Sequence, residues 1–196
     1  MPDVPFERDH TAVLIADFYA EMMNTLSHAT GRGVVQKASA IQASARDAGV
    51  MVCYCATVFR PGYPEIGQRN KTFSRRKASG QTAIPNPIDL IHPGVRPHDD
   101  EVVVGKHRVN ALYATGLDLV LRANDIRDLV ILGYATSGVI LSTVRYAADL
   151  DYNLFVVEDC CSDSDVDVHD FLINRILPRQ ADIVQSDDVI QALGAL

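Results

Sequence analysis

Two charged side chains stand where apolar runs of the sequence end, and their types suit proton transfer. Asp17 directly follows the first apolar run, Lys106 follows the third, and a turn that begins at Gly133 follows the fourth. If these runs are parallel strands, their carboxyl ends meet at one edge of a sheet, which is where α/β proteins bind ligands. An acid, a base and backbone N–H donors would then share a crevice, as in an active site. Each residue alone also has a simpler interpretation, because an Asp there can cap a turn and a Lys can be solvated.

The elements that must position these residues follow from an alternation of short apolar runs and helical patterns. The runs are unbroken rather than alternating, which is typical of parallel strands buried on both faces. The predicted strands cover 12–16, 50–58, 101–104, 129–132, 154–157 and 182–184, and helices are predicted over 34–48, 112–123, 139–150 and 166–177. This rhythm predicts an α/β fold with a three-layer, doubly wound, mostly parallel sheet. We expect residues 1–196 to form a single domain.

The composition limits the partners of the protein. Its formal net charge of -7 argues against a general binder of nucleic acid or of anionic membranes. The sequence has no long apolar run and does not begin like a signal peptide, so we expect a cytoplasmic protein. In a reducing compartment Cys53, Cys55, Cys160 and Cys161 are free thiols. Their spacing is not the usual pattern of zinc ligands, and we predict neither a metal nor a cofactor.

One long segment breaks the alternation and is expected to border the crevice. Residues 60–97 are rich in proline, glycine and basic side chains, as is typical of a lid or substrate loop. Arg60 and Arg108 offer paired donors for a carboxylate, although each is equally consistent with a solvated surface arginine. Further candidates for contact with a substrate are Phe18, Tyr63, Phe73 and Tyr134.

The stretch 133–143 resembles the signature of a known family. It reads Gly-Tyr-Ala-Thr-Ser-Gly-Val-Ile-Leu-Ser-Thr and is similar to the Gly-x-x-Thr-x-x-Cys pattern of the isochorismatase-like, or cysteine hydrolase, superfamily. With Asp17 and the stretch 106–111, the resemblance extends over most of the chain. It implies that Asp17 and Lys106 form a catalytic pair that manages protons.

The same resemblance makes two statements about the backbone of the turn. A cis peptide bond between Tyr134 and Ala135 is implied, as is an oxyanion hole formed by the N–H groups of Ala135 and Val139. Such donors stabilise a developing oxyanion, and they survive a change of side chain. The resemblance also implies a homo-oligomer, a dimer or a tetramer.

Position 139 departs from the signature, because valine stands where the superfamily has its nucleophilic cysteine. Valine cannot attack a substrate. The resemblance therefore implies a hydrolase that acts on a small anionic molecule with Asp17 and Lys106 and without that nucleophile. True isochorismatases, which cleave a vinyl ether, are one specific case. The alternative is a catalytically silent protein that binds a small molecule with the same fold.

Two other classes fit the sequence less well. The metal ligands of the superfamily's nicotinamidases are missing after the second predicted strand, where the chain reads Thr-Val-Phe-Arg. A nucleotide-dependent oxidoreductase would show a Gly-x-Gly-x-x-Gly motif after the first strand, and none is present.

The remaining polar residues are expected to be structural. His107 lies between two cationic residues, and His169 falls in a late polar helix and is expected to face solvent. The acids of 158–163 are expected to cap the helix that follows them. The adjacent Cys160 and Cys161 are expected to lie too far along the fold to replace the missing nucleophile.

Overall fold

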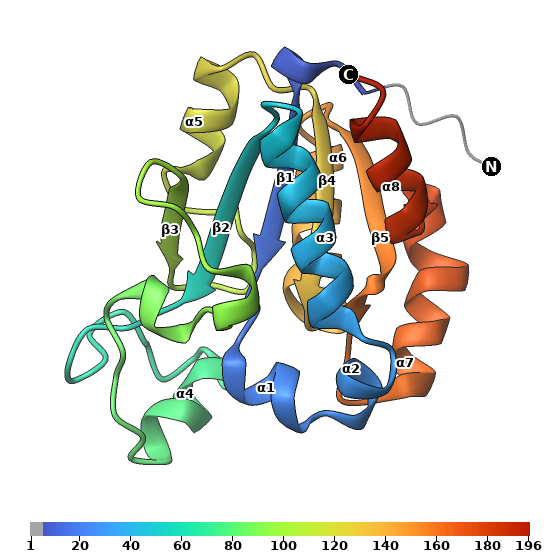
Figure 1. The fold of residues 1–196 in the computed structure, drawn as a ribbon. Coiled ribbons are helices and arrows are strands. Elements are labelled where there is room, and N and C mark those ends of the chain that lie inside the picture. Colours follow the sequence, from blue (N-terminus) through green and yellow to red (C-terminus); the bar gives the residue numbers. More distant parts are fainter. Residues whose placement is uncertain (1–5) are drawn as a thin grey trace.

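The computed structural model describes residues 6–196, whose strands form one six-stranded sheet (Figure 1). The strands are β1 (Thr11–Ala16), β2 (Met51–Thr57), β3 (Val102–Lys106), β4 (Asp128–Tyr134), β5 (Asn153–Ser162) and β6 (Asp182–Val184). Their order is β3-β2-β1-β4-β5-β6 and all neighbours are parallel, which confirms the predicted doubly wound α/β fold. The order reverses between β1 and β4, so the expected ligand site lies at the carboxyl ends of these two strands.

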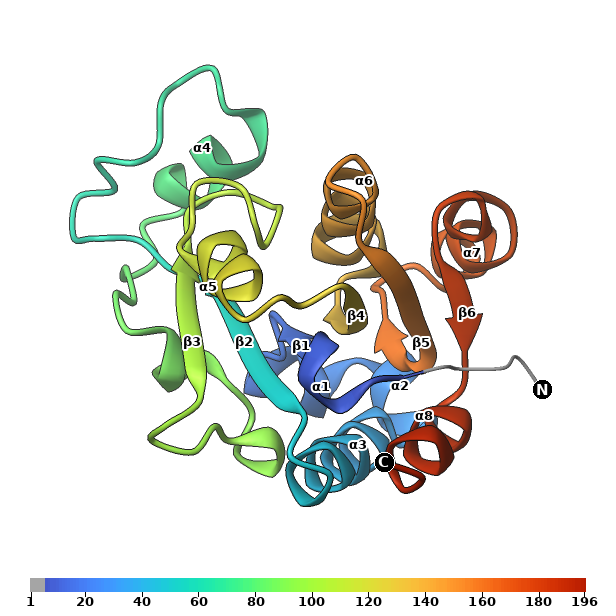
Figure 2. The same ribbon diagram turned by 90° about the horizontal axis from the view of Figure 1, so that it is seen from above.

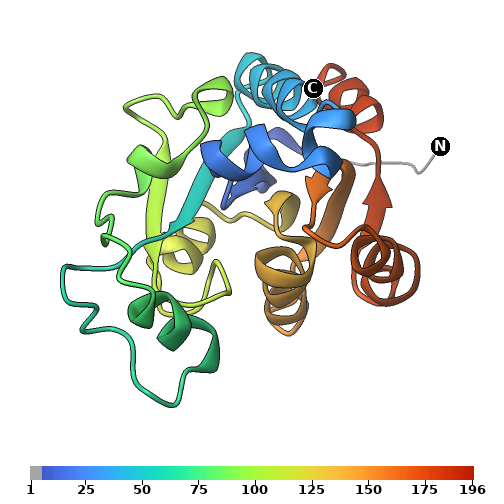
Figure 3. The same cartoon turned by 90° about the horizontal axis from the view of Figure 1, so that it is seen from below.

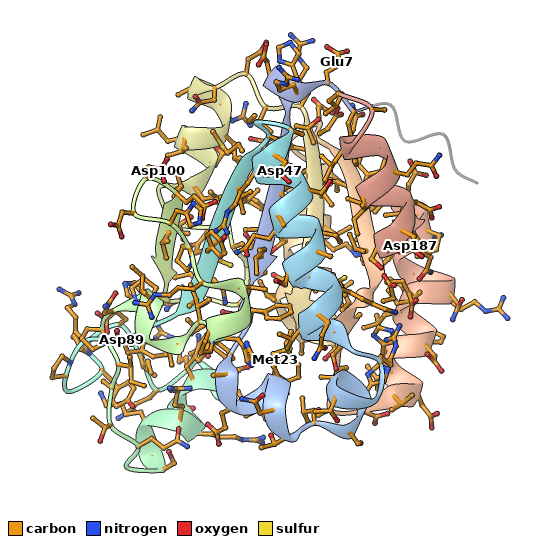
Figure 4. The ribbon with its side chains drawn as sticks, viewed as in Figure 1. Glu7, Met23, Asp47, Asp89, Asp100 and Asp187 are labelled. Carbon is orange, nitrogen blue, oxygen red and sulfur yellow. The ribbon has the colours of Figure 1, made fainter. Side chains whose placement is uncertain are left out.

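Helices cover both faces of this sheet and complete the three layers (Figure 2). One face carries α1 (Ala20–Thr25), α2 (Ser27–Gly31), α3 (Val34–Asp47) and α8 (Ser186–Leu193), and the other carries α5 (Leu117–Ala123), α6 (Leu141–Ala148) and α7 (Val166–Phe171). Each face has its own apolar core. Ile15 of β1 and Met23 of α1 belong to the first, and Leu14 of β1 belongs to the second; Figure 4 labels Met23. Successive strand residues thus enter opposite cores, which explains the unbroken apolar runs.

Some element boundaries differ from the predictions for local reasons. The helix predicted from residue 112 begins only at Leu117, because Asn110 Oδ1 accepts the N–H groups of Leu112 (2.7 Å) and Tyr113 (2.8 Å) and holds a turn there. The fifth strand continues past residue 157 to Ser162. The sequence pattern does not predict the short helices α1, α2 and α8, because helices of this length depend on packing rather than on intrinsic propensity.

The segment 60–97 lies beside α1 at the carboxyl edge of the sheet, which Figure 3 shows from below. It contains α4 (Lys71–Ala78) and two short 3-10 turns. Phe59, Tyr63 and Ile66 form a small apolar cluster of their own at the start of this segment. The segment is therefore irregular, as predicted, but it has an internal core that holds its shape.

Candidate active site

Asp17 opens the loop after β1 and forms a buried ion pair with Lys106. Its backbone has a φ of 49°, and its N–H donates to the carbonyl of Cys55 on β2 (2.9 Å). Aspartate tolerates this left-handed conformation, which persists only where the surrounding structure holds it. Its Oδ2 lies 2.6 Å from Nζ of Lys106, the last residue of β3. Both side chains are buried, so each charge is balanced chiefly by the other.

Two residues that sequence reasoning missed complete this arrangement. Thr57, the last residue of β2, donates its N–H to Asp17 Oδ1 (2.9 Å), and its hydroxyl accepts from Lys106 Nζ (2.5 Å). Tyr19 folds back over Asp17: its N–H donates to the Asp17 carbonyl (2.8 Å) and its phenol donates to Oδ1 (2.5 Å). We call Asp17, Tyr19, Thr57 and Lys106 the pocket cluster. A signal for Thr57 was available, because it lies next to the carboxyl end of the predicted strand 50–58.

The environment of Tyr19 keeps its phenol protonated. Burial, and then the negative charge of Asp17, raise the pKa of Tyr19 well above its usual value. The hydroxyl also accepts the N–H of Thr57 (2.9 Å). Tyr19 is therefore a hydrogen-bond donor to Asp17 and an acceptor from the end of β2.

The turn after β4 lies against the backbone that leads into Asp17. Gly133 pairs with Ala16 in the sheet and has a φ of 142°; a Cβ there would lie 1.9 Å from the carbonyl oxygen of Ala16. Only glycine fits this approach. The peptide bond between Tyr134 and Ala135 is cis, which confirms that prediction. The N–H of Ala135 donates to no protein acceptor within residues 6–196.

A pocket of about 420 Å³ opens beside the pocket cluster. Tyr19, Thr57 and Tyr134 contribute to its lining from the carboxyl edge of the sheet. The segment 60–97 contributes several further lining residues, including Arg76, which confirms the prediction that this segment borders the site.

The sequence matches a known family over most of its length. The isochorismatase domain family matches residues 11–188, a range that contains the pocket cluster and the turn after β4. The chain belongs to the isochorismatase family.

Two relatives illustrate the range of similarity. The uncharacterized isochorismatase family protein YecD of Escherichia coli O157:H7 is 35% identical over 95 residues, which are 48% of this chain and 50% of YecD. The maleamate amidohydrolase of Pseudomonas putida is 27% identical over 162 residues, 83% of this chain and 75% of that enzyme. The match to YecD thus spans only about half the length of either protein.

Solved structures of similar proteins share the fold. An isochorismatase family protein from Burkholderia thailandensis has a TM-score of 0.82 at 25% identity, covering 97% of this chain and 99% of that chain. A cysteine hydrolase from Pseudomonas syringae pv. phaseolicola has a TM-score of 0.86 at 21% identity, covering 97% of this chain and 95% of that chain.

Three of the predicted substrate contacts lie outside the pocket of this family member. Phe18 is buried and packs in the core on the α3 face. The side chain of Arg60 is 71% exposed and forms an ion pair with Glu65. Arg108 donates to the carbonyl of Glu65 (3.3 Å) and borders a different, shallow groove. The geometry does not bring these three side chains to the pocket cluster.

The other three predicted contacts are near the pocket in different ways. Tyr134 lines it directly. Tyr63 and Phe73 pack around Phe59 within the 60–97 segment, and the Tyr63 hydroxyl donates to the carbonyl of Gln81 (2.7 Å), a lining residue. Tyr63 and Phe73 therefore shape the segment rather than line the pocket.

A second polar cluster lies on the β5 side of the turn, and it corrects the prediction that His169 faces solvent. His169 is only 1% exposed, and its Nδ1 lies 2.8 Å from Oγ1 of Thr136. Its Nε2 lies 3.2 Å from Arg32 Nη1 and 3.3 Å from Glu158 Oε1, and Arg32 and Glu158 form an ion pair. We call Arg32, Thr136, Glu158 and His169 the turn cluster. Sequence reasoning missed it because its members come from four separate stretches of the chain.

The predictions for the acids and cysteines after residue 157 also need correction. Asp159 caps α8 rather than the next helix, since it accepts from the N–H (2.8 Å) and the hydroxyl (2.7 Å) of Ser186. Cys161 pairs with Gly133 in the sheet, so the adjacent cysteines are close to the turn and not far from it. Both Cys160 and Cys161 are nevertheless fully buried.

The remaining sequence interpretations concern His107, the cysteines of β2, metals and membranes. His107 is structural as predicted, with its Nδ1 2.7 Å from the carbonyl oxygen of Val58. Cys53 and Cys55 share one core face, as predicted. Within residues 6–196, no group of three or more His, Cys, Asp or Glu side chains could hold a metal ion. The same residues include no helix that is long and apolar enough to cross a membrane.

Proposed function

We propose that this protein is a hydrolase of a small anionic molecule that uses Asp17 and Lys106 as an acid–base pair and no cysteine nucleophile. The observation that carries the proposal is the buried 2.6 Å pair of Asp17 and Lys106 beside a pocket. Proton transfer by positioned side chains is effective in such an enclosed site. Relatives named as amidohydrolases support a hydrolase.

The state of the four cysteines supports a mechanism without a thiol. The signature position holds Val139, whose side chain is buried in the core on the α6 face. Burial raises the pKa of Cys53 and Cys161 to about 12, and it raises the pKa of Cys55 and Cys160 further still. The thiolate is the reactive form of cysteine, and these thiols hold little of it near neutral pH. The nucleophile in this proposal is therefore water.

The backbone of the turn supplies the second part of the proposed chemistry. The N–H groups of Ala135 and Val139 are proposed to bind the oxyanion that forms when water adds to a carbonyl carbon. One feature supports this role: within residues 6–196 the Ala135 N–H has no protein acceptor. Donors fixed in advance stabilise developing charge without reorganisation.

Arg76 is the proposed anchor for the negative charge of the substrate, in place of Arg60 and Arg108. Its side chain lines the pocket and packs over the ring of Phe59. Its Nε is buried without a hydrogen-bond partner, and its guanidinium forms no ion pair with any acid of residues 6–196. A buried donor of this kind is costly unless a ligand satisfies it, and guanidinium matches a carboxylate well.

The proposal is tested by a hydrolysis screen of small carboxylate-bearing amides, esters and vinyl ethers. We expect turnover that Asp17→Asn abolishes and that thiol alkylation leaves unchanged. Arg76→Ala should raise KM at least about tenfold through the loss of a charge-assisted contact, whereas the matched control Arg60→Ala should not. Ligand binding without any turnover would contradict the hydrolase and support a silent binding protein. The predicted homo-oligomeric state remains a prediction that sedimentation can test.

A further inference from the structure

Tyr19 stands between the pocket and the acid–base pair. The lining of the pocket includes Tyr19 and Thr57 but neither Asp17 nor Lys106, which lie behind them. A molecule in the pocket therefore meets the Tyr19 side chain before it can reach the Asp17 carboxylate.

The Asp17 carboxylate is already occupied by donors from the protein. Its Oδ1 accepts the Thr57 N–H and the Tyr19 hydroxyl, and its Oδ2 accepts Lys106 Nζ. A water molecule that is to lose a proton to Asp17 needs a route past these contacts.

The Tyr19 hydroxyl provides such a route. It donates its proton to Asp17 Oδ1 at 2.5 Å and accepts the Thr57 N–H at 2.9 Å. The Thr57 N–H also donates to Asp17 Oδ1 (2.9 Å), so it keeps a partner when a water in the pocket takes the acceptor site of the phenol. The turn that brings Tyr19 over Asp17 and the hydrogen bond from its hydroxyl to Oδ1 fix the direction of the phenol.

We propose that Tyr19 is a catalytic residue that relays a proton from the attacking water to Asp17 during hydrolysis of a small amide or ester. This rests on the proposed function. As the water oxygen bonds to the carbonyl carbon, its proton passes to the Tyr19 oxygen, and the original phenolic proton passes to Asp17 Oδ1. The C=O electron pair moves onto the carbonyl oxygen, and the Ala135 N–H donates a hydrogen bond to that oxyanion.

The same relay runs backwards to complete the reaction. The electron pair of the oxyanion re-forms the C=O bond, the bond between carbon and leaving group breaks, and the proton on Asp17 returns through Tyr19 to the leaving amine or alcohol. Water is the co-reactant of the substrate, and Tyr19 and Asp17 end in their starting protonation states. The raised pKa of Tyr19 suits a relay, because the phenol accepts one proton at the same time as it donates another and therefore does not need to ionise.

The test compares Tyr19→Phe with Tyr152→Phe, a matched control. Tyr152 is also buried and also donates to an aspartate, with its hydroxyl 3.2 Å from Asp118 Oδ1, but it lies near the start of β5, at the other end of the sheet. We expect Tyr19→Phe to lower kcat by about 100-fold or more while KM changes less than about twofold. Tyr152→Phe should keep kcat within about twofold, and circular dichroism should show both variants folded.

A proton inventory of the wild type gives a second reading that needs no variant. Turnover in mixtures of H₂O and D₂O should follow a curve that requires two protons in flight. A straight line for the wild type, or a kcat of Tyr19→Phe equal to that of Tyr152→Phe, would overturn the relay. If Asp17→Asn still abolishes turnover in that case, the proposed function stands without the relay. A wild type that hydrolyses none of the compounds contradicts the proposed function, and the relay falls with it.

Discussion

The two polar clusters beside the turn after β4 are similar in composition but differ in what they border. Each contains one ion pair and at least one hydroxyl: Asp17 with Lys106 on the β1 side, and Arg32 with Glu158 on the β5 side. The pocket cluster contributes two side chains to the wall of a 420 Å³ pocket. The turn cluster instead contacts the turn itself, through His169 and Thr136.

The comparison shows that a buried ion pair does not by itself mark a reactive site. Burying charge is unfavourable in both clusters, and pairing offsets that cost in both. The pocket cluster differs because Tyr19 and Thr57 connect its charges to space for a ligand. The turn cluster holds the opposite side of the same turn, so we expect its variants to change stability more than chemistry.

The largest effect is expected from breaking the buried pair of the pocket cluster. Lys106→Met leaves the Asp17 carboxylate buried without its partner and should reduce the free energy of unfolding by about 3–5 kcal/mol. The double variant Asp17→Asn with Lys106→Met should recover most of that loss, because no unpaired charge remains. Urea denaturation measures all four proteins of this cycle, and strictly additive changes would show that the two residues do not interact.

The turn cluster should make the free energy of unfolding depend on pH in the acid range. A hydrogen bond from His169, and then the charge of Arg32, lower the pKa of Glu158 from 4.5 to about 2, against the opposing effect of burial. Because the folded pKa is lower than the unfolded one, this stabilisation is complete above about pH 4.5 and is lost as the pH falls toward 2. This stabilisation should amount to about 3 kcal/mol, because the Glu158 side chain is only 22% exposed and its charge is little screened by solvent.

Glu158→Gln separates this contribution from general acid denaturation. Chemical denaturation of both proteins between pH 6 and pH 2.5 should show a steeper loss for the wild type, so that the two curves converge at low pH. Parallel curves would mean that Glu158 does not carry the effect.

A smaller effect on the free energy of unfolding is expected from a variant of Thr136, the turn residue that contacts His169. Thr136→Val keeps the shape of the side chain but removes the hydroxyl, which donates to the Ser162 carbonyl (3.2 Å) and contacts His169 Nδ1 (2.8 Å). It should cost about 1–2 kcal/mol of unfolding free energy. We expect kcat to fall less than about tenfold, in contrast to Tyr19→Phe. A loss of kcat as large as that of Tyr19→Phe would erase the distinction between the two clusters.

Residues next to one another in the sequence carried enough information to predict the fold and part of the site. The unbroken apolar runs predict a parallel sheet because its strands are buried on both faces. Asp17 and Lys106 each follow such a run, and parallel strands place their carboxyl ends at one edge, so the pairing of these two residues was predictable. The turn at Gly133 was predictable too, since its spacing matches a family signature.

Tertiary structure decided the contacts between residues that no local pattern connects. Tyr19 reaches Asp17 only because the loop after β1 folds back, and Arg76 lines the pocket only because of how the 60–97 segment packs. His169 is buried because α2 and β5 bring Arg32 and Glu158 to it. Arg60 and Arg108 had the right chemistry for an anchor, but Arg60 forms an ion pair with Glu65 and Arg108 lines a separate groove. Sequence determines which strand ends carry reactive groups, whereas side-chain direction depends on packing partners that lie far apart along the chain.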